Sequence, residues 1–219
     1  KELEYPFDAA YIIKKRKSLK KALLADGTSR IRKKIAVFGG STTSDIVKTL
    51  ELFLLDAGIE PEFYESEYAQ YFQDAMFPDE TLLSFKPDIV FIHTTNRNVT
   101  NWPEMTDTTE QIDEKLHTEI NRFTAMWKSI AEKFHCPIIQ NNFEMPLYRL
   151  LGSRDAWDIH GRTNFLTRLN EAFYAYAREN DSFYIHDLNF VSADYGLKEW
   201  SNPCLLYTSP SPRDGLLSR

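Results

Sequence analysis

The chain has 219 residues, which is enough for one α/β domain with little left over. Its composition, 42% hydrophobic and 26% charged residues, supports a folded core and excludes intrinsic disorder. The net charge of -6 gives no electrostatic basis for binding nucleic acid, and no run approaches the roughly 20 apolar residues of a membrane span. Only Cys136 and Cys204 occur as cysteines, so we expect a reducing, cytoplasmic compartment and no membrane partner.

The first segment, residues 1–29, is predicted to be a basic helical extension. From Tyr11 to Leu24, apolar residues recur at helical spacing with basic residues between them. Such a run is most often a solvated helix face, but a basic amphipathic helix can also bind an anionic surface. The basic residues are Lys14, Lys15, Arg16, Lys17, Lys20 and Lys21.

Residues 30–203 alternate short apolar runs with segments of helical periodicity. Strands that alternate with helices imply right-handed crossovers and a parallel sheet covered on both faces. The sequence therefore predicts an α/β, three-layer, flavodoxin-like fold with a five-stranded parallel sheet in the order 2-1-3-4-5. The predicted strands are Lys34–Gly39, Pro61–Glu65, Pro87–His93, Cys136–Gln140 and Phe183–Asp187, and the predicted helices are Ser44–Ala57, Asp107–Phe134 and Asn164–Glu179.

The best candidate site is the loop from Gly39 to Thr43, because ligands bind such sheets at the carboxyl ends of the strands. Gly39 and Gly40 allow a tight turn and close backbone approach. Ser41 is a candidate nucleophile, and the hydroxyls of residues 41–44 are candidates to cap the next helix. Thr42 and Thr43, with the free N–H groups of that helix, suit an anion or oxyanion. The alternative is a capped helix after a glycine turn, without function.

Two other strands end in polar loops that we expect near the same edge of the sheet. After the third strand, Asn96 could donate its side-chain N–H to an oxyanion, and Arg97 could bind a carboxylate or phosphate, with Asn98 beside them. After the second strand, Ser66 could line the same crevice or only cap a helix. The alternative for Asn96 and Arg97 is that both bond only to loop backbone.

A nucleophilic serine also needs a base. Asp158 and His160 follow the fourth strand by a long loop and could form an orienting carboxylate and base. His186, followed by Asp187 at the end of the fifth strand, is the alternative histidine. No group of residues has metal-ligand spacing, so we expect no metal and no other cofactor in this chain.

The order of strand, Gly-x-Ser, helix, apolar strand and loop asparagine resembles an SGNH hydrolase domain. The resemblance implies that Ser41 is the nucleophile and that Asn96 contributes to the oxyanion hole. The sequence departs from that pattern in three places. Ser66 and Glu65 stand where the family has a glycine, Thr94-Thr95-Asn96-Arg97 replaces Gly-x-Asn-Asp, and no Asp-x-x-His follows the fifth strand.

A narrower set of motifs resembles the N-terminal SGNH-like domain of FkbH-like proteins, over about residues 30–203. The motifs are Gly39–Ser44, Glu62–Tyr68, His93–Asn98 and the closing Tyr195–Trp200. The resemblance implies a missing C-terminal phosphatase domain of the haloacid-dehalogenase (HAD) type, which would hold the Asp-x-Asp motif and Mg²⁺. It also implies a bacterial polyketide or polysaccharide pathway, in which a glyceryl unit passes from a phosphorylated donor to an acyl carrier protein.

This domain is then expected to handle substrate or partner rather than to catalyse. Two alternatives stay open: a stand-alone SGNH esterase or acyl hydrolase that uses Ser41, and a non-catalytic module that binds phosphate or a carrier protein. Residues 204–219 read as a non-native tail, because the character of the sequence changes after Pro203 and Ser-Pro-Ser-Pro interrupts any period.

Overall fold

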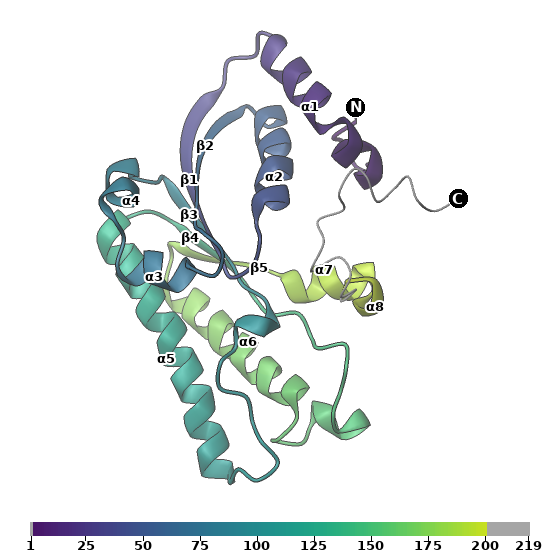
Figure 1. Ribbon diagram of the computed structural model, residues 1–219, viewed down its shortest axis with the longest axis vertical. Coiled ribbons are helices and arrows are strands. Elements are labelled where there is room, and N and C mark those ends of the chain that lie inside the picture. Colours follow the sequence, from purple (N-terminus) through teal and green to yellow (C-terminus); the bar gives the residue numbers. More distant parts are fainter. Residues whose placement is uncertain (1, 201–219) are drawn as a thin grey trace. The chain divides into compact units, whose positions relative to one another are not determined.

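The computed structural model describes residues 2–200 and is shown in Figure 1. The chain divides into two compact units. The first unit holds the sheet and the helices next to it. The second unit holds loops and helices that lie, along the sequence, between or after the segments of the first unit. The first comprises Lys1–Thr94, Asn121–Asn141 and Tyr176–Ile185, and the second comprises Thr95–Ile120, Asn142–Ala175 and the chain from His186 on.

The sheet has five strands in the order β2-β1-β3-β4-β5, which confirms the predicted order. β1 pairs in parallel with β2 and β3, and β3 pairs in parallel with β4. Ile138 N–H donates to the Ser182 carbonyl and Asn142 N–H to the His186 carbonyl, so β5 also runs parallel to β4. The strands are β1 (Ile31–Gly39), β2 (Ile59–Glu65), β3 (Ile89–His93), β4 (Ile138–Asn141) and β5 (Phe183–His186).

The central strands are buried because both of their faces are covered. Ala36, Val37 and Phe38 of β1 are fully buried, as are Val90 and Ile92 of β3. A strand buried on both faces reads as a continuous apolar run, which is why these two strands were predictable.

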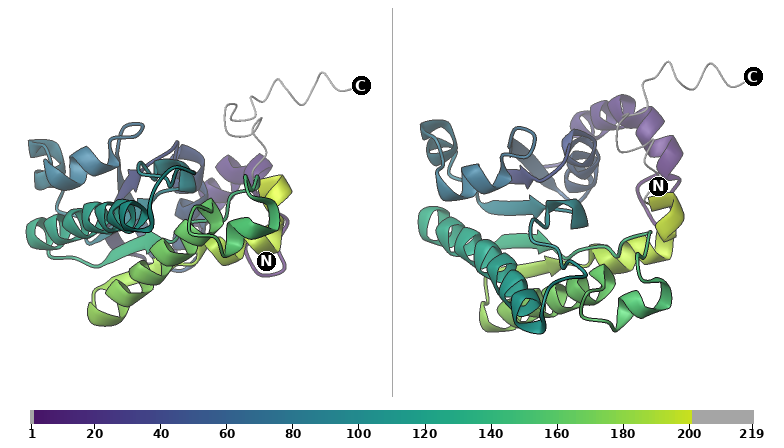
Figure 2. Two further views of the ribbon diagram at one scale, coloured as in Figure 1. Left: turned by 90° about the horizontal axis from the view of Figure 1, so that it is seen from below. Right: turned by 60° about the horizontal axis from the view of Figure 1, so that its bottom comes forward.

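Six helices have residues in the first unit: α1 (Ala9–Ala25), α2 (Ser44–Asp56), α3 (Tyr71–Met76), α4 (Glu80–Phe85), the second half of α5 (Thr109–Phe134) and the last residues of α6 (Arg162–Glu179). Figures 1 and 2 show α1 lying against α2. The second half of α5 is bonded to α3, because Ser129 Oγ donates to the Ala75 carbonyl (2.8 Å) and Lys133 Nζ to the Met76 carbonyl (2.6 Å). The segment between β2 and β3 thus contains two short helices, α3 and α4, of which α3 is held by α5.

The second unit contains the first half of α5, most of α6 (Arg162–Glu179), and two pieces of 3₁₀-helix, η1 (Asn96–Asn98) and η2 (Gly152–Ala156). It also contains α7 (Leu188–Tyr195) and α8 (Leu197–Trp200), which the sequence pattern did not predict. The predicted tail, residues 204–219, lies outside the described residues. No helix among residues 2–200 is both long and apolar enough to span a membrane.

Candidate functional site

The loop after β1 is fixed to the end of β3. Gly40 N–H donates to the His93 carbonyl at 2.8 Å. A Cβ atom on Gly39 would lie 2.6 Å from Thr43 Cγ2 and 2.7 Å from the Ser41 carbonyl oxygen, closer than real Cβ atoms approach other groups. Glycine is therefore required at position 39 for the chain to turn from β1 into α2.

The hydroxyl groups in this loop do not cap α2 as predicted. Thr43 is the N-cap residue, but its side chain makes no capping hydrogen bond. Its backbone angles, φ -108° and ψ -7°, differ from the extended conformation that most N-cap residues adopt. Ser41 is half-buried, Thr42 is exposed, and the Ser41 hydroxyl has no hydrogen bond within residues 2–200. The first turn of α2 thus begins without a side-chain cap, a geometry that suits an anion.

Ser66, a candidate either to line the crevice or to cap a helix, links β2 to α3. It is buried; its N–H donates to the Val37 carbonyl (3.0 Å) and its Oγ to Asp74 Oδ2 (2.6 Å). The Tyr64 hydroxyl approaches the same carboxylate at 3.4 Å. Burial, with the negative charge of Asp74, raises the pKa of Tyr64 to about 12. Ser66 therefore has a structural role at the end of β2.

A buried polar network holds the ends of β3 and β4 together. Thr94 N–H donates to Asn141 Oδ1 at 2.8 Å, and Asn141 Nδ2 donates back to the Thr94 carbonyl. Gln140 Nε2 donates to Thr94 Oγ1 (3.0 Å), and Trp127 Nε1 donates to Gln140 Oε1 (3.1 Å). This network fixes the point at which the chain leaves β3 for the loop of Asn96.

In the second unit, η1 is a short capped turn. Asn98 Oδ1 accepts from Thr95 N–H at 2.8 Å, and Arg97 N–H donates to Thr95 Oγ1 at 3.3 Å. Thr95 and Asn98 complete a capping box, so Asn98 shapes the loop. The Arg97 side chain is exposed and has no ion pair within residues 2–200.

Glu144 supports Asn96 from the loop after β4. Asn96 N–H lies 3.3 Å from Glu144 Oε2, and Asn96 Nδ2 lies 3.4 Å from the Glu144 carbonyl oxygen. Glu144 is 6% exposed, and this burial raises the pKa of its carboxyl to about 7, partly opposed by hydrogen bonds and the charge of Arg97. A carboxyl group that titrates near neutral pH therefore contacts the loop asparagine. Glu144 was not among the residues predicted from the sequence.

Asp158 and His160 do form a pair, as predicted. His160 Nδ1 lies 2.9 Å from Asp158 Oδ1, and Arg154 donates to the other carboxylate oxygen at 2.6 Å. His160 Nε2 faces the carbonyl oxygen of Asp107 at 3.1 Å. Both partners of the ring are hydrogen-bond acceptors, an arrangement that favours the ring with a proton on each nitrogen and opposes its action as a base. Accordingly, the pKa of His160 is raised, chiefly by its hydrogen bond to Asp158.

The alternative histidine, His186, ends β5, and its carbonyl oxygen accepts from Asn142 N–H at 3.1 Å. Asp187 Oδ1 caps α7 by accepting from Phe190 N–H (3.1 Å) and also accepts from Asn142 Nδ2 (2.7 Å). Asp187 is therefore a helix cap. Within residues 2–200, no group of three His, Cys, Asp or Glu side chains is arranged to hold a metal ion.

The parallel five-stranded sheet in the order β2-β1-β3-β4-β5, with helices between its strands, defines a flavodoxin-like α/β domain. The chain belongs to the family of FkbH N-terminal domains, which matches residues 34–212. No curated protein matches it.

Among solved structures, the chain is similar to the N-terminal part of protein BF1531 from Bacteroides fragilis, described as containing a phosphatase domain complexed with Mg. The identity is 20%, the TM-score is 0.70, and the match covers 84% of this chain but 47% of that one. Two weaker neighbours are a putative acylhydrolase from Bacteroides fragilis (17% identity, TM-score 0.42, covering 82% of this chain and 77% of that one) and a GDSL-like lipase from Bacteroides thetaiotaomicron (15%, 0.39, 79% and 78%).

Proposed function

We propose that this chain is the substrate- and partner-handling N-terminal domain of a larger enzyme, which transfers a glyceryl-type unit from a phosphorylated three-carbon donor to an acyl carrier protein. Its membership of the FkbH N-terminal domain family carries this proposal. The phosphatase domain described for the BF1531 neighbour supports a second domain after this one. That domain would supply the Asp-x-Asp motif and Mg²⁺, since no Asp-x-Asp occurs in this chain.

The surroundings of Ser41 support a role of this domain in binding substrate or partner rather than in hydrolysis. Within residues 2–200, its hydroxyl has no hydrogen bond to a histidine or a carboxylate. In the second unit, both ring nitrogens of His160 are engaged. A serine hydroxyl without a base stays protonated at neutral pH and is a weak nucleophile.

A fluorophosphonate probe tests this part of the proposal. We expect no labelling that depends on Ser41, so the wild-type chain and Ser41→Ala should give the same background. Labelling of the wild type that disappears in Ser41→Ala would establish the alternative, a stand-alone SGNH esterase or acyl hydrolase.

The transfer itself can be followed by mass spectrometry of the carrier. The complete enzyme, incubated with a phosphorylated three-carbon donor and a holo acyl carrier protein, should increase the mass of the carrier by one glyceryl-type unit. Ser41→Ala should retain this activity. A carrier whose mass does not change with either enzyme would contradict the proposed reaction.

The exposed Arg97 favours a second candidate function, the binding of a phosphate-bearing ligand. Arginine binds phosphate in a planar, two-pronged contact, and a charge-assisted hydrogen bond contributes about 1.5–3 kcal/mol. We expect Arg97→Ala to weaken phosphate-ligand binding by about that amount in calorimetry. Arg97→Lys, which keeps the charge but not the planar fork, should recover only part of the loss. Equal affinity in all three chains would exclude this role.

A further inference from the structure

The helix α1 carries six basic residues and no acidic one between Ala9 and Ala25. The whole chain has a net charge of -6, so the charge of this helix is opposite to that of the protein. Helix stability alone does not explain this pattern, because a solvated helix gains from Glu–Lys pairs four residues apart and loses from like charges at that spacing.

One side of α1 packs against α2 in the first unit. Ile12 is 2% exposed, while Leu19 and Leu23, at helical spacing from it, are half-buried. At the margins of this packed face, Arg16 pairs with Asp45 of α2 at 3.0 Å and Lys20 pairs with Glu51 of α2 at 2.7 Å. Two of the six cations are thus neutralised within the fold.

The opposite side of α1 presents cations that are not neutralised. Lys14, Lys17 and Lys21 are three and four residues apart, so they lie on one stripe of the helix. All three are exposed, and none has an ion pair within residues 2–200. Ile13 (58% exposed) and Leu24 (51% exposed) lie on the same side, eleven residues and therefore about 16 Å apart.

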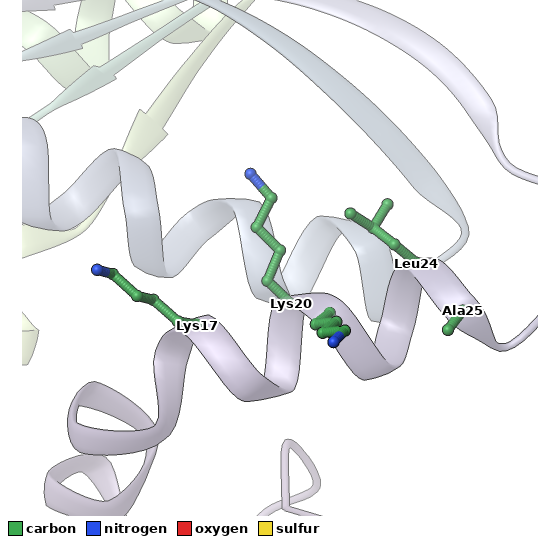
Figure 3. Close-up of a pocket in the computed structure, with 5 residues that line it drawn as sticks. Lys17, Lys20, Leu24 and Ala25 are labelled. Atoms are coloured by element: carbon green, nitrogen blue, oxygen red, sulfur yellow. The ribbon is translucent and has the colours of Figure 1, made fainter.

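A shallow hollow of about 370 Å³ lies along this helix and is lined by Lys17, Lys20, Lys21, Leu24 and Ala25. Figure 3 shows the labelled side chains on successive turns of α1, with α2 alongside. The surface therefore combines three unpaired cations with two exposed apolar side chains over the length of one short helix.

We propose that this outward face of α1 docks an acidic helix of the acyl carrier protein. Carboxylates of that helix would pair with Lys14, Lys17 and Lys21, and its apolar side chains would contact Ile13 and Leu24. Charge complementarity of this kind increases the association rate and selects the partner. Two apolar side chains are too few for the wide apolar face with which helices insert into lipid, which favours a protein partner. The inference rests on the proposed function, because it assumes that a carrier protein is the acceptor.

The test measures binding of a fluorescein-labelled holo acyl carrier protein to the 219-residue chain by fluorescence anisotropy. We expect the triple variant K14E/K17E/K21E to weaken binding at least about tenfold at low salt, and the wild-type affinity to fall steeply between about 0.05 and 0.5 M salt. The matched control is K86E/K128E/K198E, which changes three exposed lysines outside α1 and gives the same net charge. It should weaken binding less than about twofold. Circular dichroism establishes that each variant keeps its helices.

Each other outcome has a definite meaning. If the triple variant and its control weaken carrier binding equally, the proposed docking surface is wrong, because only the net charge would then matter. Binding that the triple variant leaves unchanged would also overturn it, while the proposed function would stand. If no chain binds the carrier and the mass of the carrier does not change with the complete enzyme, the proposed function fails as well. Tighter binding to vesicles of anionic phospholipid than to the carrier would overturn the choice of partner.

Discussion

Glu144 is a buried acid whose protonation state changes near neutral pH. The residue is 6% exposed, and burial raises the pKa of its carboxyl from 4.5 to about 7. The folded protein therefore binds this proton more tightly than the unfolded chain does. The stability that results is fully present below about pH 4.5 and is lost as the pH rises through about 7.

We predict that the free energy of unfolding of the wild type falls between about pH 5 and pH 8 by up to about 3 kcal/mol, and that Glu144→Gln removes most of this fall. Glutamine keeps an oxygen that can accept from Asn96 N–H but cannot ionise. Urea unfolding of both chains at the two pH values measures the effect. Glu132→Gln, at an exposed position on α5, should keep the wild-type pH dependence. The same fall in Glu144→Gln and the wild type would show that another group is responsible.

The sequence predicted some of these residues and missed others for physical reasons. Asn96 was found because it follows β3, at the carboxyl end of a parallel strand. The same rule applied to β4 would have indicated Asn141, Asn142 and Glu144, which lie at or just after its end. No sequence signal could show that His160 Nε2 faces the Asp107 carbonyl, because the two residues are 53 positions apart.

The packing of α1 against the rest of the first unit can be tested by comparing two neighbouring isoleucines of this helix. Ile12 is 2% exposed and Ile13 is 58% exposed. Truncation of a buried isoleucine leaves a cavity, so Ile12→Ala should destabilise the chain by about 2–5 kcal/mol. Ile13→Ala should change stability by less than about 0.5 kcal/mol. Thermal or urea unfolding of both variants gives the comparison. Similar small effects would mean that α1 contributes little to the folded unit.

Helix and strand types were easier to predict than their ends and caps. The apolar periodicity predicted α2, α5 and α6 within a few residues of their observed bounds. It did not predict α7, whose exposed Phe190 and Val191 disturb the expected pattern. It also predicted a hydroxyl cap for α2 that Thr43 does not make, because the cap depends on the backbone angles of a tight glycine loop rather than on residue type.

In the whole molecule, the order of the strands followed from general rules for how strands and helices are connected along a chain, which need no side-chain detail. Alternating strands and helices imply parallel crossovers, and the apolar runs of β1 and β3 indicate central strands. The division into two units could not be predicted, because it depends on which segments of α5 and α6 pack with which loops.

The sheet should therefore differ in stability from its centre to its edge. β1 lies between β2 and β3, and its residues Ala36, Val37 and Phe38 are fully buried. β2 is an edge strand whose Phe63 and Tyr64 are half-buried, and alternate N–H groups of an edge strand point away from its only neighbour. We predict that amide hydrogens of β1 and β3 exchange at least about tenfold more slowly than those of β2, measured by mass spectrometry under native conditions. Equal protection of β2 and β1 would contradict this, because the edge strand would then open only when the whole sheet unfolds.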